Sequence, residues 1–81
     1  MKITVLFFGA CREAAGVSEL TCELNAPADV AQAFAEIKRC FPTLEAFERS
    51  ALFALNEEHA RLDQPVRDGD TLAIFPPVSG G

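Results

Sequence analysis

Four stretches of the chain have the alternating or continuous apolar pattern of β-strands. They are residues 2–8, 18–24, 51–56 and 71–75. The second alternates cleanly, with Leu20, Cys22 and Leu24 on one face and Glu and Thr side chains on the other. The first becomes apolar on both faces toward its end, so either both faces are covered or one of them meets a partner. Residues 59–62 are expected to add a short strand at a sheet edge.

The apolar positions change to a helical period after Asp29. Asp29 and Gln32 have the spacing of a capping box, with Asp in the place of Ser or Thr. Pro42 disfavours helical backbone at Phe41, so the helix is expected to end near that residue. The apolar stripe consists of Val30, Ala33, Phe34, Ile37 and Phe41. The pattern predicts one amphipathic helix between two groups of strands.

The remaining segments are predicted to be connections. Residues 9–17 are expected to form a loop with one short helical turn between Gly9 and Gly16. Residues 43–50 have the composition of a polar connection, and Pro65 excludes a central strand in its surroundings. Turns are predicted at residues 57–58 and 67–70.

The order of elements predicts an α+β fold in which one main helix covers one face of a mixed sheet of four or five strands. The first two strands are expected to pair antiparallel. The first and last strands are the most hydrophobic, which favours a parallel pair at the centre of the sheet. This is the β-grasp arrangement. We expect residues 1–75 to form this domain and residues 76–81 to form an extended tail.

Some apolar residues of the two central strands are expected to face away from the helix. In the last strand, Leu72 and Ile74 would point inward. The outward set is Leu6, Phe8, Ala73 and Phe75. If the first and last strands are neighbours, these side chains form one exposed patch, which is typical of an interface. The alternative is that a loop anchored by Leu44 and Phe47 covers them.

The composition restricts the class of partner. The 81 residues are 49% hydrophobic, enough for one small core, and the net charge is −5. Nucleic acids and anionic membranes attract basic surfaces, so neither is expected as a partner. The apolar start of the chain is too short for a signal peptide, and no apolar run reaches the length of a membrane span. A partner with a basic groove remains compatible with this charge.

The residues that carry chemistry are few. Three widely spaced cysteines, Cys11, Cys22 and Cys40, indicate neither a metal site nor a disulfide framework, and they fit the cytoplasm. Each is expected to be a buried small hydrophobe. His59, the single histidine, has no catalytic motif around it, and no glycine-rich phosphate loop is present. We therefore expect no cofactor on this chain and no active site of its own.

The C-terminal residues combine two prolines with two closing glycines. Pro76 and Pro77 stop the last strand and stiffen the exit, because proline fixes φ and lacks an N–H. Val78 and Ser79 are short, whereas Gly80 and Gly81 have no Cβ and can enter a channel too narrow for other residues. The tip is expected to carry a free carboxylate. The alternative is a disordered glycine end without a role.

Several motifs together resemble one family. They are Leu6-Phe7-Phe8, Arg12-Glu13 followed by Gly16, Ala54-Leu55-Asn56, Asp68-Gly69-Asp70 and Phe75-Pro76-Pro77-Val78-Ser79-Gly80-Gly81. The chain resembles the small subunit of molybdopterin synthase over essentially its whole length. That family consists of sulfur carriers of the ubiquitin-like β-grasp superfamily. Ser79 stands where the family often has Thr, and His59 stands where relatives have a Leu that contacts the partner.

The resemblance implies a function. An activating enzyme would adenylate the Gly81 carboxylate with ATP and Mg²⁺, and a sulfur donor such as a cysteine desulfurase or rhodanese-like protein would convert it to a thiocarboxylate. The tail residues Val78, Ser79 and Gly80 would enter a channel of the large subunit, in a heterotetramer. There the sulfur would pass to cyclic pyranopterin monophosphate. The resemblance assigns the partner interface to Leu6, Phe8, Arg12, His59 and Phe75, with Arg12 facing the activating enzyme.

Three other interpretations remain open. A thiamine-pathway sulfur carrier would use the same chemistry with another acceptor, although the Phe-Pro-Pro-Val motif argues against it. A protein modifier would end as an isopeptide on lysines. A plain interaction module would not need its C-terminal glycines.

Overall fold

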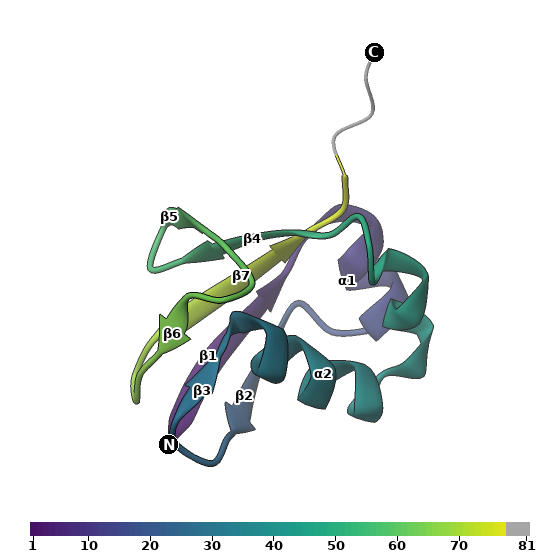
Figure 1. Cartoon of the computed structure of the whole chain (residues 1–81). Helices are drawn as coiled ribbons and strands as arrows, with labels where there is room; N and C mark the ends of the chain where they lie inside the picture. The colour runs from purple at the N-terminus through teal and green to yellow at the C-terminus, as the bar shows by residue number, and fades with distance from the viewer. Residues whose placement is uncertain (78–81) are drawn as a thin grey trace.

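The computed structural model describes residues 1–77, in which helices cover one face of a five-stranded mixed sheet (Figure 1). The sheet has the strand order β2-β1-β7-β4-β5. Its strands are β1 (Lys2–Phe7), β2 (Glu19–Glu23), β4 (Leu52–Leu55), β5 (Glu58–Ala60) and β7 (Thr71–Phe75). The strand boundaries differ from the predicted ones by one or two residues, the usual uncertainty at element ends.

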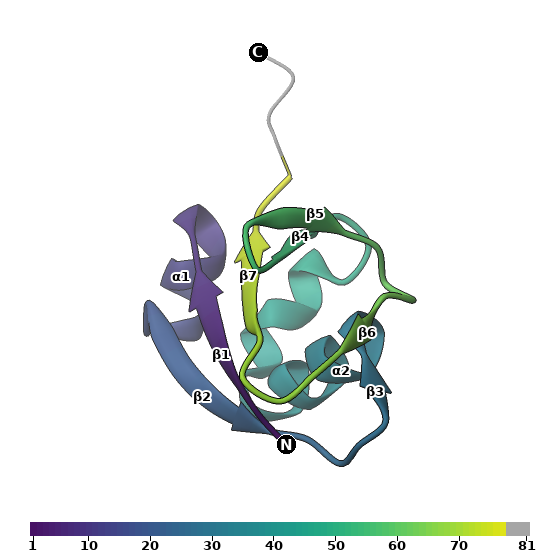
Figure 2. The same ribbon diagram turned by 90° about the vertical axis from the view of Figure 1, so that its left-hand side faces the viewer.

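The first and last strands lie side by side and run parallel, as their hydrophobicity predicts (Figure 2). Strand β1 also pairs antiparallel with β2, and β7 pairs antiparallel with β4. This mixed sheet with helices on one face is the ubiquitin-like β-grasp fold, so the predicted fold class is confirmed.

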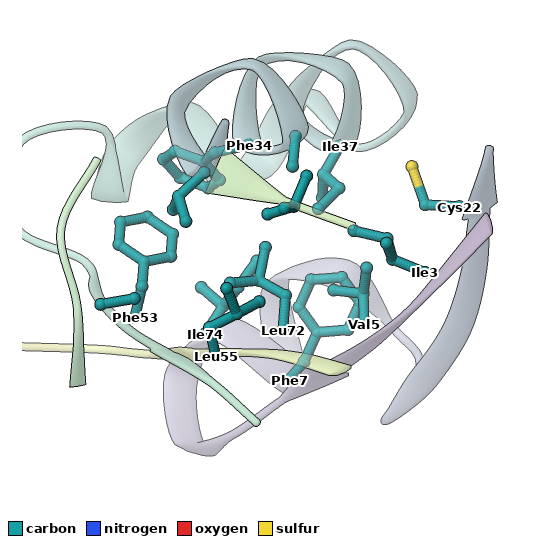
Figure 3. Packing of buried hydrophobic residues seen from close by; sticks show 14 of the residues in the cluster. Ile3, Val5, Phe7, Cys22, Phe34, Ile37, Phe53, Leu55, Leu72 and Ile74 are labelled. Atoms are coloured by element: carbon teal, nitrogen blue, oxygen red, sulfur yellow. The ribbon is translucent and has the colours of Figure 1, made fainter. Parts of the chain in front are cut away.

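The main helix, α2 (Val30–Cys40), begins with the predicted capping box. The Gln32 N–H donates to the Asp29 carboxylate at 2.8 Å, and the Asp29 N–H donates to the Gln32 side chain at 3.0 Å. The apolar stripe of α2 packs onto the sheet, where the rings of Phe34 and Phe53 meet edge to face at 5.0 Å. Figure 3 shows Phe34 and Ile37 directed toward the inward side chains of the strands.

The segment after β1 contains more helix than the sequence predicts. Instead of one turn, α1 (Gly9–Ala15) has seven residues and ends at Gly16, whose φ of 79° is the left-handed conformation that glycine adopts readily. Its buried residues, Cys11 and Ala15, are small and four positions apart, so they form one inward stripe. So short a stripe carries little periodic signal, and the sequence therefore underestimates this helix.

The connection after α2 is a 3-10 helix, η1 (Pro42–Phe47). It contacts α1 and α2, its Leu44 is fully buried, and Phe47 packs against the core cluster. Both anchors were predicted. They belong to the helical side of the core, so η1 does not provide the predicted alternative cover for the outward apolar residues.

Two local features were not predicted. Strands β3 (Ala28–Asp29) and β6 (Pro65–Val66) form a separate antiparallel pair, too short to show any period in the sequence. The turn before β5 also lies one residue earlier than expected, because Asn56 and Glu57 have φ values of 51° and 72°. Asn56 is well suited there, because its side chain accepts from the Thr71 N–H at 2.9 Å.

The capping box gives the first prediction. Asp29→Ala leaves the Gln32 N–H without its side-chain acceptor and should lower the free energy of unfolding by about 1 kcal/mol. Urea denaturation followed by circular dichroism measures this loss. Asp29→Ser, which keeps an acceptor, is the matched control and should lose less. Equal loss in the two variants would show that the cap does not stabilise α2.

Candidate functional site

The outer face of the sheet, away from α2, contains a row of side chains that crosses four strands. Backbone register pairs Leu6 with Ala73, Ala73 with Ala54, and Ala54 with His59. Leu6 and Ala54 are half-buried, whereas His59 is exposed on the edge strand β5. The structure therefore places three apolar residues in a continuous row, with His59 at its margin.

A second apolar row lies beside the first, closer to the C-terminal end of β7. The rings of Phe8 and Phe75 are stacked, with 4.7 Å between their centroids and an interplanar angle of 8°. Leu52 of β4 lies opposite Phe75 in the strand register. Phe8 is 41% exposed and Leu52 is 39% exposed, which is high for large apolar side chains. We call the two rows together the outer patch: Leu6, Phe8, Leu52, Ala54, Ala73 and Phe75.

The sequence predicted four members of the outer patch, and the structure brings those four together. It did not predict Leu52 and Ala54. Their signal was present, since these residues alternate with the buried Phe53 and Leu55. The sequence alone could not show that β4 is the neighbour of β7, and this pairing is what places Leu52 beside Phe75.

The outer patch adjoins the point where the chain leaves the sheet. The Phe8 N–H donates to the Ile74 carbonyl at 3.1 Å, which fixes Phe8 against the end of β7. Pro76 packs so closely on Gly9 that a Cβ at position 9 would lie 3.1 Å from the Pro76 Cγ. The predicted tail residues Val78, Ser79, Gly80 and Gly81 lie outside the described residues.

The other predicted contact residue, Arg12, lies on α1 rather than on the sheet. Its side chain is exposed, and its N–H donates to the Phe8 carbonyl at 3.4 Å, so the turn that carries Arg12 begins at the outer patch. Arg12 and the outer patch thus lie on neighbouring but different surfaces.

The outer patch consists of apolar side chains. Within the described residues 1–77, no three His, Cys, Asp or Glu side chains are grouped closely enough to hold a metal ion. None of the helices in this range has both the length and the hydrophobicity needed to span a lipid bilayer. The outer patch has no titratable member, because His59 lies only at its edge.

The three cysteines are not equivalent. Cys11 and Cys22 are buried as predicted, and burial raises the pKa of both thiols; Glu36 and Cys40 raise that of Cys22 further. The prediction is wrong for Cys40, which is exposed. Cys40 is the last residue of α2 and shares a groove with the edge strand β2, and no further strand within residues 1–77 lies beyond that edge.

Comparison with known proteins identifies the family. The ThiS family model matches residues 5–81, nearly the whole chain. The chain belongs to the ThiS family. A curated relative of this family member, the molybdopterin synthase sulfur carrier subunit of Chlamydomonas reinhardtii, is 42% identical over all of both chains.

Solved structures agree with this assignment. SAMP1 from Haloferax volcanii, 28% identical, superimposes with a TM-score of 0.90 and is covered completely, as is this chain. A chain in the complex of subunits 1 and 2 of molybdopterin-converting factor from Helicobacter pylori is also 28% identical. The match covers both chains completely, with a TM-score of 0.70. This ThiS family member is thus similar both to a small archaeal modifier protein and to a protein solved with a partner subunit.

The burial of the cysteines gives the second prediction. Under native conditions iodoacetamide should add to one thiol per chain, at Cys40, because Cys11 and Cys22 are buried and their raised pKa values disfavour the reactive thiolate. In urea all three thiols should react. Intact mass counts the adducts, and Cys40→Ser is the control that should remain unmodified. Two or more native adducts would contradict the described core.

Proposed function

We propose that this chain carries sulfur, as a C-terminal thiocarboxylate, to the large subunit of a molybdopterin synthase. The observation that carries the proposal is the outer patch at the root of the tail, in a chain whose full length matches sulfur carrier subunits. An exposed apolar surface suits a protein partner, and its position directs the following residues into that partner.

The chemistry takes place on the Gly81 carboxylate. An activating enzyme with ATP and Mg²⁺ converts it to an acyl-adenylate, whose AMP is a good leaving group. The terminal sulfur of a persulfide on a donor, such as a cysteine desulfurase or rhodanese-like protein, attacks the acyl carbon and displaces AMP, which gives an acyl disulfide. A second thiol on a partner protein or a thiol reductant then attacks the donor's sulfur, so that a disulfide forms and the thiocarboxylate is released. This chain itself needs no bound cofactor for these steps, and its three free thiols suit a reducing cytoplasm.

Different residues of this chain contact different partners. Phe8 and Phe75 anchor the large subunit, since stacked aromatic rings offer a large, rigid apolar area. Leu6 extends this contact, and His59 meets the partner at the margin of the outer patch. Arg12, on the adjoining α1 surface, contacts the activating enzyme. The tail residues Val78, Ser79 and Gly80 occupy the partner's channel, where the sulfur passes to cyclic pyranopterin monophosphate.

The likeness to SAMP1 favours a second candidate function, modification of other proteins. Both functions begin with activation of Gly81, but a modifier ends as an isopeptide on a lysine of its target. Intact-mass analysis of cell extracts separates them, because a carrier gives a thiocarboxylate and a modifier gives conjugates of higher mass. A thiamine-pathway carrier would differ only in the acceptor of its sulfur.

The third prediction concerns Gly81. Activating enzyme, ATP and a sulfur donor should raise the mass of the chain by the difference between sulfur and oxygen. A chain extended by one residue beyond Gly81 should gain no mass, because the reacting group is the carboxylate of a terminal Gly81. Unchanged thiolation of the extended chain at its new terminus would contradict the requirement for terminal Gly81.

The fourth prediction concerns Phe75. Phe75→Ala should weaken large-subunit binding by about 2–4 kcal/mol, the usual loss at an aromatic hot spot. Its loss of folding free energy should be smaller, about 1–2 kcal/mol, because Phe75 is only half-buried. Calorimetric titration and urea denaturation measure the two quantities.

Two control variants accompany Phe75→Ala. Phe53→Ala removes a core aromatic and should lower folding stability by about 3–5 kcal/mol. Leu62→Ala removes a side chain that is 50% exposed outside the outer patch and should change neither quantity much. If Phe75→Ala destabilises the fold as Phe53→Ala does and leaves binding intact, Phe75 is a core residue and not an anchor.

The fifth prediction concerns Gly80. Gly80→Ala should preserve folding and docking but slow sulfur transfer, since an added methyl group can hold the thiocarboxylate back in the channel. A misplacement of about 1 Å can reduce a rate on the order of 10²-fold. Single-turnover conversion of the pterin precursor by the thiolated variant measures it. Transfer at the wild-type rate would mean that the channel has room for a side chain.

A further inference from the structure

Strand β2 forms a free edge of the sheet, on the side opposite β5. No other strand within residues 1–77 pairs with this edge. The Phe7 N–H donates to Ser18 at 2.9 Å and the Leu24 N–H donates to Met1 at 2.8 Å, which sets the alternation of the β1–β2 ladder. By that alternation the backbone groups of Leu20 and Cys22 face β1. The backbone groups that face outward belong to Glu19, Thr21 and Glu23.

A groove of about 320 Å³ lies between this edge and α2. Its lining residues are Leu20, Thr21, Cys22, Glu23, Glu36, Ile37, Cys40 and Phe41. Ile37 and Cys22 are buried beneath it, Leu20 and Phe41 are half-buried, and Cys40 is exposed. An unpaired strand edge beside an apolar groove is the arrangement that accepts an added strand, since the edge supplies hydrogen bonds and the groove accepts alternate side chains.

The charged residues along the β2 edge indicate which kind of strand can pair with it. Glu19 and Glu23 lie two positions on either side of Thr21, and all three are exposed. If two copies of the chain paired antiparallel about Thr21, each Glu19 would lie opposite a Glu23, and like charges opposite each other are destabilising. A strand with Lys or Arg at its first and fifth positions would instead place a positive charge opposite both carboxylates: Glu19, and Glu23, whose other neighbour is the exposed Lys2 Nζ at 3.8 Å. The net charge of −5 favours the same occupant.

We propose that the β2 edge binds an extended basic segment of another protein, which adds as a further strand of the sheet. In this segment the first and fifth residues are Lys or Arg and pair with Glu19 and Glu23. The second and fourth residues are apolar and extend from positions opposite Leu20 and Cys22 into the groove. The site lies along the β2 edge, whereas the outer patch lies on the outer face of the sheet, and the two adjoin only where Glu19 pairs with Leu6. The site does not use the tail, so binding there can be measured without sulfur transfer.

The probe is a capped, fluorescent peptide, Lys-Val-Thr-Val-Lys flanked by glycines, and the control peptide carries Glu in place of both Lys residues. Anisotropy should show that the Lys peptide binds roughly tenfold more tightly, because each cross-strand charge pair contributes modestly. The Glu19→Lys, Glu23→Lys double variant should reverse this preference. Equal binding of the two peptides, or no binding, would overturn the proposal.

Two readouts locate the bound peptide. Amide hydrogen exchange of Glu19, Thr21 and Glu23 should slow, whereas that of Leu20 and Cys22 should change little, because their N–H groups already face β1. Alkylation of Cys40 at the groove should slow as well. Thr21→Pro removes one outward N–H, a change that an edge strand tolerates, and should weaken binding. Protection confined to the outer patch would refute the proposed site.

Two further controls distinguish peptide binding at this edge from large-subunit binding at the outer patch and from self-association. Phe75→Ala, which alters the outer patch, should bind the Lys peptide as the unmodified chain does, and this result stands whether or not the chain carries sulfur. Sedimentation should show a monomer without peptide. A dimer that Thr21→Pro abolishes would overturn the proposal, because a second copy would then occupy the edge.

Discussion

The parallel pairing of β1 with β7 is the interaction on which the rest of the structure depends. It joins residues that are almost a whole chain apart, with Val5 beside Leu72 and Phe7 beside Ile74. These four side chains are almost completely buried and form the layer onto which α2 packs. Because side chains alternate along a strand, the same pairing places Leu6 beside Ala73, and Phe8 beside Phe75, on the other face. One register therefore creates both the core and the outer patch.

This dual use explains why the two central strands are apolar on both faces. A register shift by one residue would exchange the core layer with the outer patch. The register also sets where the chain leaves the sheet, since β7 ends at Phe75 and Pro76 packs on Gly9 at the start of α1. The β1–β7 register thus sets the positions of both the aromatic stack and the root of the tail.

Much of this could be predicted from the sequence, because strong local signals agree with the fold. The capping box of Asp29 and Gln32 and the alternation of residues 18–24 depend only on neighbours in the chain. Pairs of elements without such signals were missed. The β3–β6 pair is too short to show a period, and Leu52 joins the outer patch only through the pairing of β4 with β7. The exposure of Cys40 likewise depends on β2 being an edge strand, which no residue near Cys40 indicates.

In the function proposed above, the outer patch delivers a thiolated tail to a partner. The most direct measurement is the intact mass of this chain after it is purified from sulfur-supplied cells through its large subunit. The chain should co-purify, and its mass should exceed the sequence mass by the difference between sulfur and oxygen. Co-purification should fail for Phe75→Ala. An unmodified mass in every preparation, or recovery of the chain only as conjugates to other proteins, would contradict the account.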